Sequence, residues 1–443
     1  PPQQCCSTRI PTFPSCTALR AGGAISLMYV ERPAISPPTE MPIRRNKTTG
    51  FSRDSRHFGP LPAGLIEGGI DAFLIETCQD LLQVKCAINA CMDALKTAGK
   101  STDDIPIMVS ITIETTGTML VGSDLQTVVH ALAPYPILSL GLNCATGPEL
   151  METHVAWLSE HWQGHISVVP NAGLPELVDG CTHFPLSPHA YGVAMKRFVE
   201  QYGVNIVGGC CGTTSEHTRM LFKSSAGKHS PYRTPPLITK ISGLESLTIN
   251  DETRPVIVGE RTNVLGSRRF KRLIGEGKIE EAAELGRHQI HSGAHVLDVC
   301  LQDPDRDEVA DISNFLRTLT RKVKSPLIID STNEAVIEEA LKNTPGKSII
   351  NSINFEDGEE RFDRVVPLLK KYGAAIIIGS IDEDKQQAQA ITRERKLAIA
   401  QRARELCTEK WSLPEEDLIF DALVFPCGTG DENYIGSAVE TIE

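Results

Sequence analysis

The sequence predicts an α/β protein built from two successive series of parallel strands. Short apolar runs alternate with amphipathic helical stretches along residues 61–223 and again along residues 253–443. Such alternation is typical of βαβ units, in which helices connect parallel strands. Between the two series, residues 224–252 are rich in Ser, Lys and Pro, and we expect a linker there. Residues 1–60 show no helix or strand periodicity and are expected to be an irregular N-terminal segment.

The first series predicts five strands and the second predicts six. In the first series, strands are expected at 72–77, 107–113, 137–143, 166–170 and 205–208, with helices at 63–67, 81–97, 125–132, 148–161 and 187–201. In the second series, strands are expected at 256–263, 295–298, 327–331, 348–352, 374–380 and 417–421, with a helix at 279–292. In folds of this kind the functional site forms where the carboxyl ends of the strands enter the loops.

Composition narrows the class of protein. A chain of 443 residues predicts two or three domains, each large enough for its own core. The net charge of −12 argues against a nucleic-acid partner. Because no apolar run reaches the ~20 residues that span a bilayer, no membrane partner is expected. The 13 cysteines lack the spacing of a disulfide framework, which favours a reducing compartment and a cytoplasmic location.

Three cysteines occupy matching positions in the first series. Cys210 and Cys211 follow an apolar run and Gly208-Gly209, and Cys144 ends another apolar run. Neighbouring strand side chains point to opposite faces, so adjacent cysteines reach one ion only where the chain leaves strand geometry, which glycine permits. Three thiolates leave one position of a tetrahedral zinc ion open, as in catalytic sites. The alternative is three buried structural cysteines, but an adjacent pair after two glycines favours the metal site.

Polar side chains end the strands of the second series. They are Glu260, Asn263, Asp298, Asp330, Asn351 and Asp421. Carboxylates and amides bind a flat heterocycle rich in N–H and C=O groups through paired hydrogen bonds at its edge. Any one of these residues could instead be a helix N-cap or a turn residue, but six together favour a binding site. This half contains no Walker-type loop or histidine cluster, so no nucleotide or metal site is expected in it.

These motifs together resemble the cobalamin-dependent methionine synthase family. The motifs of the first series resemble its homocysteine-binding barrel and are Gly208-Gly-Cys-Cys-Gly-Thr-Thr214, Gly141-Leu-Asn-Cys144, Ile75-Glu-Thr77 and Pro170-Asn-Ala-Gly173. Those of the second series resemble its pterin-binding barrel and are Gly259-Glu-Arg-Thr-Asn263, Ile329-Asp-Ser-Thr332, Ile350-Asn-Ser352 and Ile419-Phe-Asp421. The resemblance implies a methyltransferase that forms methionine from homocysteine and methyltetrahydrofolate by way of cobalamin. The homocysteine-binding barrel would occupy residues 61–223 and the pterin-binding barrel residues 253–443.

The resemblance also implies roles for individual residues. The catalytic zinc ligands would be Cys144, Cys210 and Cys211, and the homocysteine sulfur would complete the coordination as a thiolate. The homocysteine-binding residues would be Glu76, Thr77 and Asn171, with Glu76 at the ammonium group. The pterin-binding residues would be Glu260, Asn263, Asp330, Asn351 and Asp421. Cobalamin would be bound by a separate domain in cis or in trans.

Both barrels are expected to be incomplete. A (β/α)8 barrel has eight strands, whereas the two series predict the C-terminal part of the first barrel and the N-terminal part of the second. The cobalamin-binding and activation modules of the family have no counterpart in the sequence, and Cys300 stands where many relatives have Asn. We therefore expect a fragment. The alternatives are an inactive truncation, or a zinc- and pterin-binding protein without turnover; a dihydropteroate synthase would resemble only the second half.

Overall fold

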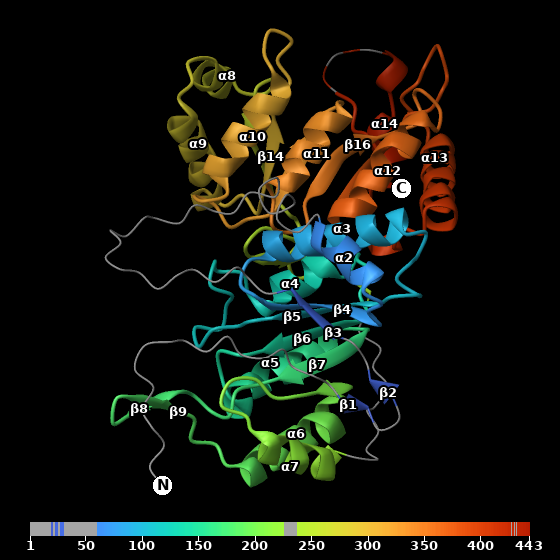
Figure 1. Ribbon diagram of the computed structural model, residues 1–443. Helices are drawn as coiled ribbons and strands as arrows, with labels where there is room; N and C mark the ends of the chain where they lie inside the picture. The colour runs from blue at the N-terminus through green and yellow to red at the C-terminus, as the bar shows by residue number, and fades with distance from the viewer. Residues whose placement is uncertain are drawn as a thin grey trace. The chain divides into compact units, whose positions relative to one another are not determined.

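The computed structural model (Figure 1) describes residues 60–225 and 237–443, except 427, 429 and 431, together with the backbone of three short strands before residue 31. The chain forms two compact units. The first comprises residues 1–125 and 136–236, and the second comprises residues 126–135 and 237–443.

In its described part, the first unit contains a six-stranded sheet whose neighbouring strands are all parallel. The strand order is β10-β7-β6-β5-β4-β3. The strands are β3 (Leu27–Val30), β4 (Ala72–Cys78), β5 (Ile107–Ile111), β6 (Ser139–Asn143), β7 (His165–Val169) and β10 (Ile206–Val207). Every residue of β5 and β6 is buried, as expected for strands in the centre of a parallel sheet.

Helices and two small hairpins complete the described part of the first unit. The helices are α2 (Pro60–Glu67), α3 (Leu81–Thr97), α5 (Pro148–His161), α6 (Pro188–Tyr202) and α7 (Ser215–Ser225). The hairpins pair β1 (Leu19–Arg20) with β2 (Gly23–Ala24) and β8 (Glu176–Val178) with β9 (Cys181–His183), both antiparallel. Helix α3 begins at Leu81 because the Asp80 carboxylate accepts a hydrogen bond from the backbone N–H of Leu82 (2.9 Å).

The second unit also contains an all-parallel six-stranded sheet among its described residues. Its order, β13-β14-β15-β16-β17-β18, follows the chain. The strands are β13 (Val258–Asn263), β14 (Val296–Cys300), β15 (Leu327–Asp330), β16 (Ile349–Ile353), β17 (Ala375–Gly379) and β18 (Leu418–Asp421). Each strand is followed by a crossover to the next, so all six carboxyl ends lie at the same edge of the sheet.

The helices of the second unit include a row of four, α9 to α12, in which each packs against the next along the sheet (Figure 1). The helices are α4 (Leu125–Leu132), α8 (Arg268–Gly275), α9 (Ile279–His291), α10 (Glu308–Leu319), α11 (Glu334–Lys342), α12 (Glu360–Tyr372), α13 (Arg393–Glu405) and α14 (Ser437–Ile442). Short turns of other helix types are η1 (Leu406–Lys410), η2 (Glu415–Asp417) and η3 (Glu432–Tyr434). All residues of α4 except the first belong to this unit, although α4 lies between β5 and β6 in the chain.

A hairpin closes one end of the second sheet. It pairs β11 (Lys240–Ser242) with β12 (Ser246–Thr248), and Ile241 packs in a cluster with Val296 and Ile328. The Ser242 hydroxyl accepts a hydrogen bond from the backbone N–H of Lys347 (3.0 Å). This hairpin lies within residues 224–252, where we expected a linker, so the described part of that segment contributes to the core of the second unit.

The α/β fold class predicted from the sequence is confirmed. The strands expected in both series are all present, and both sheets are parallel, consistent with two partial barrels. Strand β3 lies within the N-terminal segment, where no strand was expected, and pairs in parallel with β4. The residues of that segment before 60, apart from the short strands, lie outside the described part. None of the described helices combines the length and the apolar character needed to cross a bilayer.

Candidate functional site

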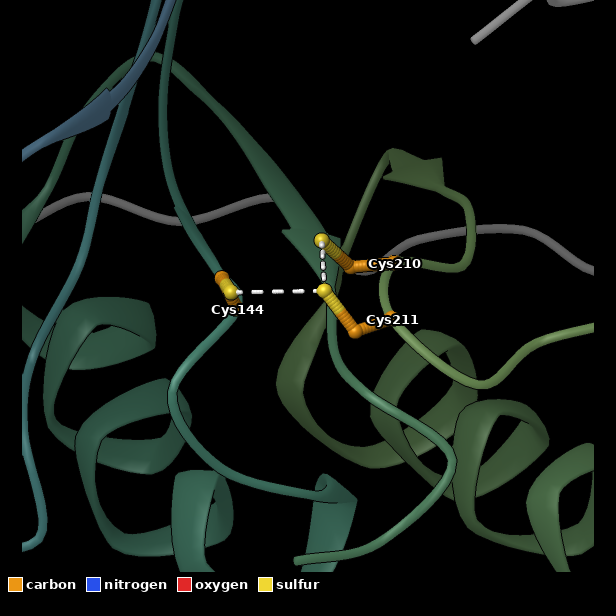
Figure 2. A group of neighbouring side chains, drawn as sticks. All are labelled: Cys144, Cys210 and Cys211. Carbon is orange, nitrogen blue, oxygen red and sulfur yellow. Dashed lines mark hydrogen bonds between the residues drawn. The ribbon is translucent and has the colours of Figure 1, made fainter. Parts of the chain in front are cut away.

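The sulfur atoms of Cys144, Cys210 and Cys211 converge at one point of the first unit (Figure 2). Cys144 Sγ lies 3.8 Å from Cys211 Sγ, and Cys210 Sγ lies 3.9 Å from Cys211 Sγ. All three atoms lie within 4.8 Å of one another. Cys211 is exposed and the other two are partly exposed, so the group is open to a ligand from solvent. The structure therefore brings together the three cysteines singled out in the sequence.

Cys144 reaches the cluster because the chain turns sharply at the end of β6. Cys144 and Ala145 have φ angles of 60° and 54°, in the left-handed region that residues other than glycine rarely adopt. The Cys144 backbone N–H donates to the carbonyl of Val169 (3.2 Å), and the Thr146 N–H donates to the carbonyl of Cys144 (2.6 Å). Such conformations persist when surrounding contacts hold them, and they concentrate at functional sites.

Cys210 and Cys211 lie in a turn that is tied to the loop after β7. The Cys210 N–H donates to the carbonyl of Pro170 (2.9 Å), and the Cys211 N–H donates to Asn171 Oδ1 (3.1 Å). The Ala172 N–H in turn donates to the carbonyl of Cys211 (2.9 Å). Since Asn171 is buried, its side chain holds the turn in place, which is a positioning contact in addition to the substrate-binding role predicted for it.

Two glycines make this turn possible. A Cβ on Gly209 would lie 2.7 Å from the side chain of Thr213, whose hydroxyl donates to the carbonyl of Cys210 (2.6 Å). Gly212 has a φ angle of 78°, and a Cβ there would lie 2.2 Å from Phe184. The chain thus leaves strand geometry after β10, as the sequence suggested, and both adjacent sulfurs turn toward Cys144.

His217 and Tyr191 support the turn that carries Cys210 and Cys211. His217 Nδ1 accepts a hydrogen bond from the Thr214 N–H (3.1 Å), and its Nε2 lies 2.9 Å from the Leu186 carbonyl. These two contacts require a neutral ring that carries its proton on Nε2. The buried Tyr191 hydroxyl lies 2.7 Å from the carbonyl of Gly208, just before the cysteines, and its ring meets that of His217 edge-on.

The three thiols do not ionise alike. Hydrogen bonds from Cys210 and Cys211 lower the pKa of Cys144. The same interaction with Cys144 raises the pKa of Cys210 and that of Cys211. By contrast, burial raises the pKa of Cys91 to about 12. The cluster therefore differs from an ordinary buried cysteine, because one of its sulfurs is stabilised as a thiolate by the other two.

The spacing and chemistry of this cluster fit a zinc ion. Zn–S bonds of about 2.3 Å place the sulfur ligands of a tetrahedral ion about 3.8 Å apart. The two shortest sulfur separations here are 3.8 and 3.9 Å. Three cysteine ligands leave one coordination position for a substrate, which is the arrangement of catalytic rather than structural zinc sites.

Of the residues predicted to bind homocysteine, Thr77 lies in contact with the segment that carries Cys144. Thr77 has a φ angle of 57° at the irregular end of β4. Its N–H donates to Asn143 Oδ1 (3.2 Å), and Asn143 Nδ2 donates to the Thr77 hydroxyl (2.8 Å). Glu76, beside it, is buried. No role was predicted for Asn143 from the sequence, although its position directly before Cys144 indicated a supporting role beside that cysteine.

In the second unit, Asn263 links two of the acidic strand residues. Its Nδ2 donates to Asp298 Oδ2 (2.9 Å) and to Asp330 Oδ2 (3.2 Å). Its Oδ1 accepts from the backbone N–H groups of Leu265 (2.8 Å) and Gly266 (3.1 Å). Every polar atom of this side chain is thereby used, which fixes the two carboxyl groups relative to the end of β13.

Burial changes the ionisation of these two carboxyl groups. It raises the pKa of Asp298 to about 7, against the lowering effect of the bond from Asn263, and the charges of Asp330 and Glu260 raise it further. Burial also raises the pKa of Asp330. Near neutral pH, Asp298 is therefore divided between a hydrogen-bond acceptor and a protonated donor. The sequence placed Asp298 at a strand end and left it out of the predicted pterin-binding residues, whereas the structure places it in the middle of β14.

The remaining predicted pterin-binding residues lie along the same edge of the sheet. Asp330 and Asn351 are register partners on β15 and β16. Asp421 ends β18, is exposed, and accepts a hydrogen bond from the Leu423 N–H (2.8 Å). Glu260 on β13 is also exposed. The structure thus groups Glu260, Asn263, Asp298 and Asp330 and places Asn351 beside Asp330. Asp421, on β18, lies two strands from Asn351 on β16.

The two units match two different family models. Residues 37–224 match the model described as homocysteine S-methyltransferase. Residues 259–442 match the model described as pterin binding enzyme. The three cysteines lie in the first match, and the acidic and amide residues lie in the second.

Curated relatives match the chain across both units. The methionine synthase of Mycobacterium tuberculosis (strain ATCC 25618 / H37Rv) is 36% identical over 414 residues, which cover 93% of this chain and 34% of that protein. The methionine synthase of Mycobacterium leprae (strain TN) is 34% identical over 423 residues, with the same coverage of 93% and 34%. The chain thus spans about a third of the length of these relatives.

A comparison with solved structures finds the homocysteine methyltransferase MmuM of Escherichia coli in its apo form. The similarity covers 40% of this chain and 59% of that chain, with 21% identity and a TM-score of 0.31. At this level it adds nothing to the sequence matches.

Proposed function

We propose that this chain, whose two units match the homocysteine S-methyltransferase and pterin binding enzyme family models, serves methyl transfer from methyltetrahydrofolate to homocysteine, which yields methionine. The observation that carries this proposal is the convergence of three cysteine sulfurs within 4.8 Å beside a partly exposed surface. A metal-binding thiolate site supplies a means of activating a substrate thiol at neutral pH, because a bound metal ion lowers the pKa of a coordinated thiol.

On the homocysteine side, Cys144, Cys210 and Cys211 would hold zinc. Bound there, zinc would lower the pKa of a coordinated substrate thiol so that it reacts as a thiolate. Asn171 and His217 would keep the adjacent cysteines oriented toward Cys144 through the backbone contacts described above. Such supporting contacts fix the direction of metal ligands.

The amino-acid part of homocysteine would be bound at the end of β4. Glu76 is buried there and offers a carboxylate to the substrate ammonium group. Asn143 holds Thr77 in its unusual backbone conformation through two hydrogen bonds. Because Asn143 directly precedes Cys144, these bonds also fix the position of Thr77 relative to Cys144. This arrangement would place the substrate sulfur and the substrate ammonium at two separate anchoring points.

On the pterin side, Glu260, Asn263, Asp330, Asn351 and Asp421 would hold the ring of methyltetrahydrofolate. Carboxylates and amides supply the acceptors and donors that complement its ring N–H and C=O groups. Loss of the methyl group from N5 is easier when a proton or hydrogen bond is supplied to that nitrogen. Asp298, with a pKa near 7, is a group at this site that can hold such a proton near neutral pH.

The methyl group would travel between the two units by way of cobalamin. As the resemblance to cobalamin-dependent methionine synthase implies, the cobalamin would be bound by a separate domain in cis or in trans. In the overall change the N5–methyl bond breaks and a sulfur–methyl bond forms, while the proton lost by the homocysteine thiol is balanced by the proton gained by N5 of tetrahydrofolate. A zinc- and pterin-binding protein without turnover would have the same two sites and would lack only this methyl transfer.

The test separates binding from turnover. Homocysteine is titrated calorimetrically into zinc-loaded protein, and methionine formation is then measured with free methylcobalamin as the methyl donor. We expect zinc-dependent binding and methionine formation, both lost in Cys210→Ser and retained in the control Cys91→Ala, whose thiol is buried in α3 outside the cluster. Binding without methionine formation would indicate the alternative, and homocysteine binding that ignores zinc would contradict the proposal.

A further inference from the structure

A single arginine connects the backbone that follows Asp330 with the backbone that follows Asn351. Arg361, in the first turn of α12, donates from Nε to the Ser352 carbonyl (3.1 Å). Its Nη1 donates to the Thr332 carbonyl (2.9 Å), and its Nη2 donates to the Ser331 carbonyl (3.2 Å). One guanidinium group thus binds three backbone carbonyls, two in the loop after β15 and one within β16.

The position of Arg361 is electrostatically unfavourable for a helix. The N-terminus of a helix carries partial positive charge, which favours acidic side chains and disfavours cations. The carboxylate of Glu334 lies 3.9 Å from the guanidinium group, at the limit of an ion pair, and the Arg361 side chain is 13% exposed. The cation is held mainly by carbonyl oxygens, which indicates that these contacts offset the cost of its position.

Strand pairing is irregular around Asn351 and Ser352 in β16. The β15–β16 register ends with the pair Asp330 and Asn351. The β16–β17 register shifts between Ile350 and Ile353, so Asn351 and Ser352 have no partner in it. A carbonyl outside a strand ladder needs another donor, and Arg361 supplies one to Ser352.

We propose that Arg361 is a positioning residue that holds Asp330 and Asn351 at the spacing that a pterin ring requires. It contacts the backbone directly after Asp330, at the end of β15, and directly after Asn351, inside β16, so it fixes these two positions relative to each other. This inference rests on the proposed function, because it assumes that Asp330 and Asn351 bind the ring. Arg361 itself would not contact the ligand.

The guanidinium group is suited to this task in a way that lysine is not. Its planar fork presents several N–H donors in fixed directions, whereas an ammonium group is a single point charge on a flexible chain. Arg361→Lys keeps the charge and cannot span three carbonyls, and Arg361→Met removes the donors entirely. Arg364, one turn along α12, provides a matched control, since it is 49% exposed and pairs with Glu334 on the surface.

Two measurements on the full chain test the proposal. Hydrogen–deuterium exchange is followed in peptides covering residues 329–334 and 350–355, and methyltetrahydrofolate binding is measured by calorimetry. In Arg361→Met we expect faster exchange in both peptides and binding weakened about 10- to 100-fold, because small misplacements of binding groups have effects of that size. Arg361→Lys should lie between Arg361→Met and the wild type, and Arg364→Met should match the wild type in both measurements.

The outcomes separate this inference from the proposed function. Unchanged exchange in Arg361→Met overturns the positioning role, whatever the ligand does. Faster exchange together with methyltetrahydrofolate binding within about twofold of the wild type also overturns it, because misplaced binding groups would weaken binding more than that. If the wild type does not bind methyltetrahydrofolate while exchange still rises in Arg361→Met, the connection of the two segments is supported and the proposed function fails.

Discussion

Asn143 and Thr77 form a reciprocal pair: the Asn143 amide donates to the Thr77 hydroxyl at 2.8 Å and accepts from the Thr77 N–H at 3.2 Å. The pair joins the ends of β4 and β6 and lies directly before Cys144. Asn143 Oδ1 also accepts from the hydroxyl of Ser110 (2.8 Å). One buried amide therefore links Thr77, a predicted substrate-binding residue, to Cys144, a proposed zinc ligand.

Replacing Asn143 should destabilise the first unit. In Asn143→Ala the Thr77 N–H and the Ser110 hydroxyl lose their acceptor, which costs about 1–3 kcal/mol for each buried group left unsatisfied. Urea unfolding measures this change, and homocysteine affinity should fall with it. The control is Asn89→Ala, which removes a buried amide bonded only locally in α3, to the Lys85 carbonyl. Equal losses of stability and unchanged homocysteine binding would contradict a special role for Asn143.

His217 should control how tightly the cysteines hold zinc. His217→Phe removes both the acceptor for the Thr214 N–H and the contact with the Leu186 carbonyl. Loss of such supporting contacts typically weakens metal affinity about 10- to 100-fold. Competition with a zinc chelator measures the affinity. His189→Phe, at an exposed site in the first turn of α6, should leave it unchanged.

Asp298 should make the stability of the second unit depend on pH. Burial raises its folded pKa from 3.8 to about 7, so folding favours the protonated form. Its contribution to the free energy of unfolding is therefore greatest at low pH and falls as pH rises from about 4 to about 7. Asp298→Asn removes this dependence and keeps an acceptor for Asn263. Denaturation at pH 5 and pH 7.5 should show the variant gaining on the wild type at the higher pH, and a constant difference would contradict the assignment.

The ion pair between Lys347 and Asp417 should be costly to break from one side. The two side chains are 4% and 2% exposed at the hairpin end of the second sheet. Lys347→Met leaves the Asp417 carboxylate buried without its cation, which costs about 3–5 kcal/mol. Lys410→Met, which removes an exposed partner of Asp363, should change the free energy of unfolding by less than about 1 kcal/mol. Similar losses in the two variants would show that burial does not decide the effect.

The sequence predicted most of the strands and the cysteine cluster because both leave local signals. The strand expected at 137–143 is β6, and the apolar period of residues 81–97 defines α3, whose bounds match. Cys210 and Cys211 after two glycines, with Cys144 at another strand end, indicated one site because carboxyl ends of parallel strands share an edge.

The β11–β12 hairpin, the Asp298–Asn263 pair and the contacts of Arg361 could not be predicted from the sequence, because they depend on residues far apart in the chain. The β11–β12 hairpin was hidden by Pro- and Ser-rich composition, and only burial of Ile241 in the core shows its role. Asp298 lies inside β14, so its pairing with Asn263 required the register of two strands. Arg361 follows no motif, since its partners are backbone carbonyls of two separate segments.

We propose that the three cysteines bind zinc and leave one position for the homocysteine sulfur. X-ray absorption at the zinc edge, measured on zinc-loaded protein before and after homocysteine is added, counts the sulfur ligands. We predict three sulfur ligands at about 2.3 Å in the free protein and four when homocysteine is bound. Zinc with no more than two sulfur ligands, or a sulfur count that homocysteine leaves at three, would contradict it.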